Sequence, residues 1–343
     1  MAVRIFNYIL FSILFFVVVL TSPARVDAGV RNFCSNVMLS LATAKKVFHP
    51  EEVPFDAKEL LTMPELPNRV AKIVQRLAPI LPPAHGLMKA ALWAKHQEVD
   101  HPTDIFAEML KWLNVKVNYK PEQLERIPKT GPVLVVINHP MGLIDGVMVG
   151  DLISKIRQDF QIMTLTILQK AAEADPRFND HLVYVIRKAK TKEEKDWNAK
   201  VLLKVVRKLK KQGGLQVIFP SGSVSVKKDG RLEDPEWEEN MIDVARLSGA
   251  QILPMFVHGE NSSAYYQIQK IHPSLRRLFY ARNLFNKGGQ KFNIEIGEPM
   301  TVDQLYGVTA KERTESLRKV IYQLGEPTSV FDQYLEELSP GLE

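Results

Sequence analysis

The strongest constraint on the fold is an uncharged apolar run, residues 133–137, that ends abruptly at His139-Pro140. A strand covered on both faces has no polar side, so a short run of this kind predicts a buried strand with helices on both sides of its sheet. Pro140 cannot continue the strand ladder, and Gly142 allows a tight turn. Asp145 and the apolar residues after it then indicate a helix. The sequence therefore predicts a histidine and a carboxylate at the carboxyl end of a core strand, where α/β sheets bind ligands.

The chain from 115 to 300 alternates between strand and helix patterns. Apolar runs predict strands near 115–117, 160–168, 182–186, 215–219 and 252–257, and the alternating residues Phe292, Ile294 and Ile296 predict a half-exposed strand. Helices are expected at about 144–157 and 191–211, from Pro235 onward, and at 309–324. This alternation predicts an α/β fold with a mixed, mostly parallel sheet flanked by helices.

The N-terminus carries a hydrophobic segment. No charge occurs between Arg4 and Arg25, and the small residue Ala28 follows. That length fits either a membrane anchor or a signal peptide cleaved after Ala28, so residues 1–28 are assigned to one of the two.

Three further regions follow this segment. Residues 29–114 read as an N-terminal helical region with proline-rich turns, including a helix capped by Thr103 that runs to Leu113. This region either packs on the sheet or lies on a membrane surface. Residues 115–300 form the predicted α/β domain, and residues 301–343 a C-terminal helical segment.

Composition limits the partners. A net charge of +6 favours anionic partners such as lipid head groups or an acidic carrier protein. The single cysteine, Cys34, excludes an internal disulfide and a cysteine-based metal site, and no metal-ligand spacing is present elsewhere. Residues 187–211 hold eleven Lys/Arg against three acidic residues, with Trp197, Val201, Val205 and Leu209 as the core-facing stripe. Nucleic acid is not expected, because no aromatic residues interleave with the charge.

Three segments carry a resemblance to a known family. NHPMGLIDG, residues 138–146, resembles the first motif of the lysophospholipid (glycerolipid) acyltransferase superfamily, in the branch with the hemolysin-like proteins and the ornithine-lipid acyltransferases. FPSGSVS at 219–225 is similar to the second signature, and ILPMFVHGENS at 252–262 to the proline-centred strand and loop after it. The resemblance implies a glycerolipid-acyltransferase-like fold. It also implies a fatty acyl transfer from acyl-CoA or acyl carrier protein to a lyso-lipid, without a cofactor or metal.

The resemblance implies roles for the residues that match the family motifs. His139 is the expected general base, because an imidazole can take the proton of an acceptor hydroxyl, and Asp145 is expected to orient its ring. The spacing of the pair is one residue longer than the family pattern. Asn138 and the stretch Pro220, Ser221, Gly222 and Ser223 are predicted to bind substrate, the latter through main-chain N–H groups that stabilise an oxyanion.

Two substitutions separate the chain from the common family signature. Ser221 stands in place of a glutamate, and Val224 in place of the arginine associated with the acceptor phosphate. Lysophosphatidic acid is therefore a doubtful acceptor, and Arg187, at the end of another strand, is the alternative cation for a phosphate or carboxylate.

Three functions stay open on the sequence. The first is a membrane-associated acyltransferase with an uncleaved N-terminal anchor and its catalytic domain on the cytosolic side, where acyl thioesters are made. The second is a catalytically silent relative that binds lipid. The third is an exported lipid-modifying protein, which cleavage at Ala28 would produce.

Overall fold

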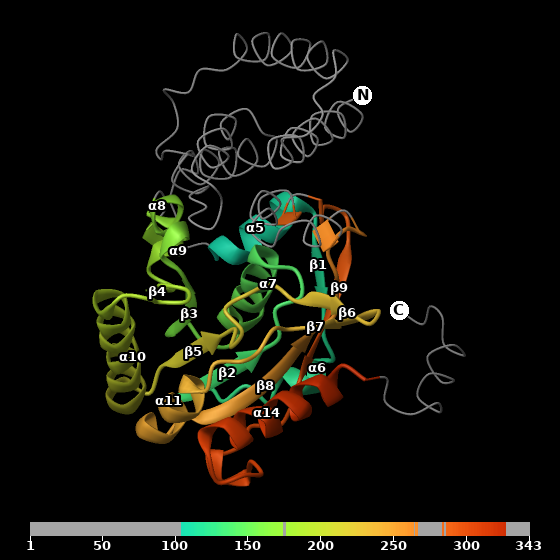
Figure 1. Cartoon of the computed structure of the whole chain (residues 1–343). Helices are drawn as coiled ribbons and strands as arrows, with labels where there is room; N and C mark the ends of the chain where they lie inside the picture. Colours follow the sequence, from blue (N-terminus) through green and yellow to red (C-terminus); the bar gives the residue numbers. More distant parts are fainter. Residues whose placement is uncertain (1–103, 174–175, 264, 267–282, 285, 327–343) are drawn as a thin grey trace, which may run out of the picture. The chain divides into compact units, whose positions relative to one another are not determined.

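The structure is a computed structural model that describes residues 104–173, 176–263, 265–266, 283–284 and 286–326 (Figure 1). The chain divides into two units, and the unit made of Val99–Gln169, Pro176–Tyr266 and Asn283–Glu343 holds the whole sheet. The segment 1–28 and nearly all of the predicted helical region 29–114 lie outside the described residues. Within the described ranges, we find no helix both long enough and apolar enough to span a bilayer.

The sheet has seven strands in the order β1-β9-β8-β2-β5-β3-β4. Five of them, from β8 to β4, run parallel, whereas β9 pairs antiparallel with β8 and parallel with β1. The predicted mixed, mostly parallel sheet is confirmed. The strands are β1 Lys116–Asn118, β2 Val133–Ile137, β3 Phe160–Leu165, β4 Leu182–Val185, β5 Leu215–Ile218, β8 Gln251–Val257 and β9 Lys291–Ile296, with a separate hairpin of β6 Val226–Lys228 and β7 Arg231–Glu233.

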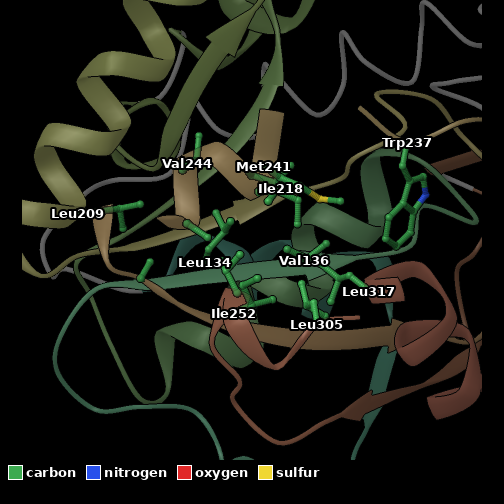
Figure 2. Close-up of a cluster of buried hydrophobic side chains, with 14 of the residues drawn as sticks. Leu134, Val136, Leu209, Ile218, Trp237, Met241, Val244, Ile252, Leu305 and Leu317 are labelled. Atoms are coloured by element: carbon green, nitrogen blue, oxygen red, sulfur yellow. The ribbon is translucent and has the colours of Figure 1, made fainter. Parts of the chain in front are cut away.

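Strand β2 lies at the centre, between β5 and β8, and all five of its residues are buried. Its side chains alternate between the two faces of the sheet. Leu134 and Val136 join a large apolar cluster that also contains Ile218 and Ile252 from the neighbouring strands (Figure 2). Burial on both faces is why the strand carries no polar residue until it ends.

Helices cover the two faces (Figure 1). Helix α7, with α5 packed on it, lies on one face, while residues of α10, α11 and α14 contribute to the apolar cluster on the other. The helices and short turns are α5 Ile105–Leu113, α6 Pro121–Leu124, α7 Leu143–Ser154, η4 Thr166–Leu168, α8 Gln169–Ala172, α9 Pro176–Asn179, α10 Lys192–Gln212, α11 Asn240–Ser248, η6 Val302–Gln304 and α14 Ala310–Leu324.

Helix boundaries differ from the prediction at two places. Helix α5 begins one residue after Asp104, whose carboxylate accepts hydrogen bonds from the N–H groups of Phe106 and Ala107, so Asp104 rather than Thr103 is its N-cap. The helix expected from Pro235 starts only at Asn240.

The remaining corrections concern β3 and α10. The strand expected to reach residue 168 stops at Leu165 and continues as the turn η4. In the predicted apolar stripe of α10, Val205 and Leu209 are buried, but Trp197 is 49% exposed and does not belong to the core.

The contact between α5 and α7 depends on a glycine. A Cβ placed at Gly150 of α7 would lie 2.4 Å from Cδ1 of the Phe106 ring, so only glycine lets α5 approach this closely. Gly146, one turn earlier in the same helix, has no atom within 4 Å of such a Cβ.

The two glycines therefore predict opposite effects of the same substitution. Gly146→Ala should raise the free energy of unfolding by roughly 0.5–1 kcal/mol, since alanine is the better helix former. Gly150→Ala should lower it by about 1–2 kcal/mol, because overpacking against Phe106 outweighs the gain in propensity. Urea unfolding of both variants checks this, and a Gly150→Ala variant as stable as Gly146→Ala would contradict the packing.

Candidate active site

The site is built where β2 ends. The chain leaves Ile137, passes through His139 and Pro140, and turns at Gly142, whose φ of +94° suits glycine, before α7 begins. This turn brings Asp145, in the first turn of α7, back to His139. The distance between His139 Nδ1 and Asp145 Oδ2 is 2.9 Å. The predicted pair therefore lies at the carboxyl edge of the sheet, and the extra residue between its members does not prevent the contact.

One oxygen of the Asp145 carboxylate accepts hydrogen bonds from both the histidine and the backbone. Its Oδ2 accepts hydrogen bonds from the main-chain N–H groups of Met141 and Gly142, each at 2.9 Å, besides the bond from His139. The side chain of Asp145 is fully buried and that of His139 is 18% exposed. Within the described part of the chain, Asp145 Oδ1 has no hydrogen-bond partner.

This geometry determines the chemistry of the imidazole. A carboxylate only accepts, so the hydrogen bond places the proton on Nδ1 of His139 and leaves the lone pair on Nε2. The ring is also stacked on Phe219, with 4.2 Å between ring centroids, and so cannot swing freely. His139 thus offers a partly exposed basic nitrogen in a fixed orientation, as general base catalysis requires.

Phe219 leads from β5 into the second signature, the 219–225 loop. The N–H of Gly222 donates to the carbonyl of Phe219 at 2.9 Å, and the N–H of Ser223 donates to Ser221 Oγ at 3.3 Å. Of the three main-chain N–H groups in the predicted stretch, those of Gly222 and Ser223 are therefore engaged within the loop. Binding of an oxyanion by residues 220–223 stays a prediction, and Gly222 and Ser223 could take part only by exchanging partners.

Asn138 has a structural role in this geometry. Its side-chain amide donates to the carbonyl of Val257 and accepts from the N–H of the same residue, at 3.0 and 2.7 Å. The amide thus continues the pairing of β2 with β8 by one step and is 3% exposed. Both of its polar groups are used, which leaves little for the substrate contact expected of it.

Arg187 is not brought to the dyad. It follows β4, at the sheet edge, and three strand spacings, about 14 Å, separate β4 from β2. Val224, in the position of the family arginine, is 5% exposed, and its Cγ2 packs against the backbone at Gly142. The Val224 position therefore presents no cation beside His139.

Three buried residues around the dyad escaped the sequence analysis. Asn261, after β8, donates its amide to the carbonyls of Pro140 and Met141. Asp234 accepts a hydrogen bond from the main-chain N–H of His139 at 3.2 Å. Lys287 reaches this edge because β9 runs antiparallel to β8 and therefore starts where β8 ends. Asn261 lies in the 252–262 segment but received no role there, and Asp234 and Lys287 belong to no motif.

Lys287 is a buried cation. Only 3% of it is exposed, its Nζ donates to the carbonyl of Glu260, and it lies 5.9 Å from the centroid of the Phe292 ring. Burial lowers the pKa of its ammonium group, and the Asp145 and Glu260 carboxylates oppose that shift. The Glu260 carboxylate is itself paired with Lys227 at 2.6 Å. An ammonium held so far from water would be stabilised by an anionic group of a substrate.

Within the described ranges, no three His, Cys, Asp or Glu side chains are arranged to hold a metal ion. The chemistry available at this edge is proton transfer by His139.

Comparison with known proteins shows the family of the chain. Residues 98–329, well over half of the chain, match the profile of the family described as Acyltransferase. The lyso-glycine lipid O-acyltransferase of Bacteroides thetaiotaomicron is 25% identical over 232 residues, which is 64% of this chain and 79% of that protein. The protein of the same name from Phocaeicola vulgatus is 23% identical over 231 residues, covering 64% and 77%.

A solved structure is also similar, namely the 1-acyl-sn-glycerophosphate acyltransferase PlsC from Thermotoga maritima. It has a TM-score of 0.41 and 18% identity, and the match covers 68% of this chain and 86% of that one. The chain belongs to the Acyltransferase family on the profile match. It is an acyltransferase of the glycerolipid acyltransferase type.

The dyad predicts the effect of Asp145→Asn. The amide offers a single acceptor oxygen, and if its NH₂ faces His139 the ring must take the other tautomer, with the proton on Nε2. Acyl transfer should then fall by up to about 10⁴-fold, the effect of the corresponding change in serine proteases. Initial rates and thermal unfolding of the same preparation measure this, and a folded variant with near-normal turnover would exclude the orienting role.

Proposed function

We propose that this acyltransferase moves a fatty acyl group from acyl-CoA or acyl carrier protein to the hydroxyl group of a lyso-lipid. The observation that carries the proposal is the 2.9 Å contact of His139 Nδ1 with Asp145, which leaves Nε2 of a partly exposed ring as a base at the carboxyl edge of the sheet. The names of the two curated relatives support a lyso-lipid as acceptor.

The reaction follows from the dyad. Nε2 of His139 takes the proton of the acceptor hydroxyl while the oxygen attacks the thioester carbonyl. The buried Asp145 carboxylate stabilises the resulting imidazolium through Nδ1–H. When the tetrahedral intermediate collapses, the carbon–sulfur bond breaks, the new ester remains, and the thiolate receives the proton held by the imidazolium.

The acceptor that best fits the surrounding residues carries a carboxylate near the hydroxyl. A glycine joined to a lipid through its nitrogen keeps its carboxylate, and the buried Lys287 supplies a point charge of the right sign on this side of the dyad. A phosphomonoester fits less well, since Val224 replaces the expected arginine and is buried.

An enzymatic assay tests the function. Purified full-length protein is incubated with labelled acyl-CoA or acyl carrier protein and three acceptors: a lyso-lipid with an amino-acid carboxylate, its methyl ester, and lysophosphatidic acid. We expect ester formation to be fastest with the free carboxylate, and lysophosphatidic acid to be no better than the methyl ester. His139→Ala should reduce the rate by about 10²–10⁴-fold, the usual effect of losing a general base.

Other outcomes would point elsewhere. A marked preference for lysophosphatidic acid would refute the acceptor assignment. A folded wild-type protein that is inactive with every donor would favour the catalytically silent relative, which the internal hydrogen bonds of Gly222 and Ser223 make the second candidate.

We also propose that the enzyme is held at a membrane by residues 1–28, with residues 29–343 on the cytosolic side. The positive charge of α10 supports attraction to anionic lipids, because this helix exposes many lysines along with Trp197. N-terminal sequencing of the mature protein and protease protection in sealed vesicles test this. An intact N-terminus with the domain digested from the cytosolic side is expected, whereas a mature chain that starts at Gly29 outside the cell would show cleavage and export.

A further inference from the structure

Asp234 is a buried carboxylate that ties the two motifs together. It is 3% exposed and follows the hairpin β6–β7, 95 residues from His139 in the sequence. Its Oδ1 accepts from the main-chain N–H of His139 at 3.2 Å and from the hydroxyl of Ser225. The N–H of Ser225 in turn donates to the carbonyl of His139 at 2.8 Å. His139, Ser225 and Asp234 thus form a closed ring of hydrogen bonds that holds the main chain of the base on both sides.

The rest of Asp234 is anchored away from the site. Its Oδ2 accepts from Nε1 of Trp237 at 3.1 Å, and Trp237 lies in the apolar cluster (Figure 2). Its N–H donates to the Tyr322 hydroxyl at 2.7 Å, and its carbonyl accepts from Arg318 at 2.6 Å. Both of these partners belong to α14. Trp237 therefore anchors the carboxylate to the apolar cluster, whereas α14 contacts only the main chain of Asp234.

This arrangement is energetically demanding. Burial raises the pKa of Asp234, and the bonds from Ser225, His139 and Trp237 only partly offset it. The side chain of Asp234 accepts hydrogen bonds from a hydroxyl, a main-chain N–H and an indole, and each of these donors is neutral. A buried carboxylate of this kind costs stability unless all its hydrogen bonds form. An apolar residue in this position would lower the stability of the fold less, but it could not hold His139 to Ser225.

We propose that Asp234 is a positioning residue for acyl transfer, which fixes the main chain of His139 to Ser225 at the end of the 219–225 loop. The inference rests on the proposed function and adds a division of labour to it. Asp145 sets the tautomer and orientation of the imidazole, whereas Asp234 sets the distance between the base and the loop that is predicted to hold the acyl carbonyl. We call this ring of His139, Ser225 and Asp234 the clamp. Because an error of about 1 Å in such a distance can cost 10²-fold in rate, the clamp should affect turnover more than substrate binding.

Asp234→Asn and Ser225→Ala test the clamp, with Tyr322→Phe as the matched control. The asparagine keeps the size but turns one acceptor into a donor, so it must lose either the bond from the His139 N–H or the bond from Trp237. We expect kcat to fall about 10–10²-fold at nearly constant KM in Asp234→Asn, and somewhat less in Ser225→Ala. In the double variant the losses should not add, because both break one ring.

Tyr322→Phe separates positioning from stability. It removes the acceptor for the Asp234 N–H without touching the ring, so the thermal midpoint should fall while kcat stays near that of the wild type. If Tyr322→Phe loses kcat in step with its stability, as Asp234→Asn does, the role of Asp234 is merely structural and the proposal fails. Wild-type kcat in a folded Asp234→Asn variant overturns it as well.

A second readout does not need turnover. The rate at which diethyl pyrocarbonate modifies His139, followed by peptide mass spectrometry, reports the surroundings of Nε2 in the folded protein. It should change in Asp234→Asn and Ser225→Ala but not in Tyr322→Phe. If the wild type proves inactive, the proposed function fails, yet this measurement still decides the clamp: equal modification rates in all four proteins overturn it.

Discussion

One carboxylate oxygen holds the site together. Oδ2 of Asp145 accepts from His139 Nδ1 and from the N–H groups of Met141 and Gly142, so a single atom fixes the tautomer of the base and closes the turn that carries it. The bond forms in a fully buried position, where hydrogen bonds are strong and where an unpaired charge would be costly. The hydrogen bonds that close the β2–α7 turn therefore also bring His139 and Asp145 together.

The direction of the strands decides what else reaches this edge. The parallel strands β2, β5 and β8 deliver His139, Phe219 and the 258–261 loop to the same end of the sheet. The reversed strand β9 adds Lys287 by starting where its neighbours finish. A uniformly parallel sheet would place that lysine at the opposite edge. The reversed direction of β9 thus places the buried ammonium group of Lys287 at the edge of the sheet where His139 lies.

Polar groups buried around the dyad fix the positions of the loops and of the base. Asn138 and Asn261 bond to main-chain groups and hold the loops at fixed distances, while Asp234 connects the base with the 219–225 loop and with α14. Each of these groups loses hydration on folding, and only its hydrogen bonds offset that loss. The geometry of the site consequently depends on buried side chains that do not touch the reacting atoms, Asp234 among them.

Local patterns in the sequence were enough to predict most of the sheet and the dyad. An all-apolar pentapeptide stopped by a proline favours a doubly covered strand, and a histidine with an aspartate beyond a glycine turn is then expected at its end. The prediction of β2, His139 and Asp145 therefore needed only neighbouring residues. The capping boxes at Thr191 and Thr309 are local for the same reason, because their partners are three residues away.

Contacts between distant segments were decided by tertiary structure alone. The sequence indicated neither the hairpin β6–β7 nor the delayed start of α11. Asp234, which lies between these two elements, bonds to His139 and to Tyr322 of α14, both far away in the sequence. Asn138 looked like a substrate contact, but its partner Val257 is 119 residues away. Arg187 looked like a phosphate ligand, and only the strand order puts it three strands from the base. Hydrogen bonds of this kind depend on which segments the sheet brings together, and no local pattern of residues encodes that.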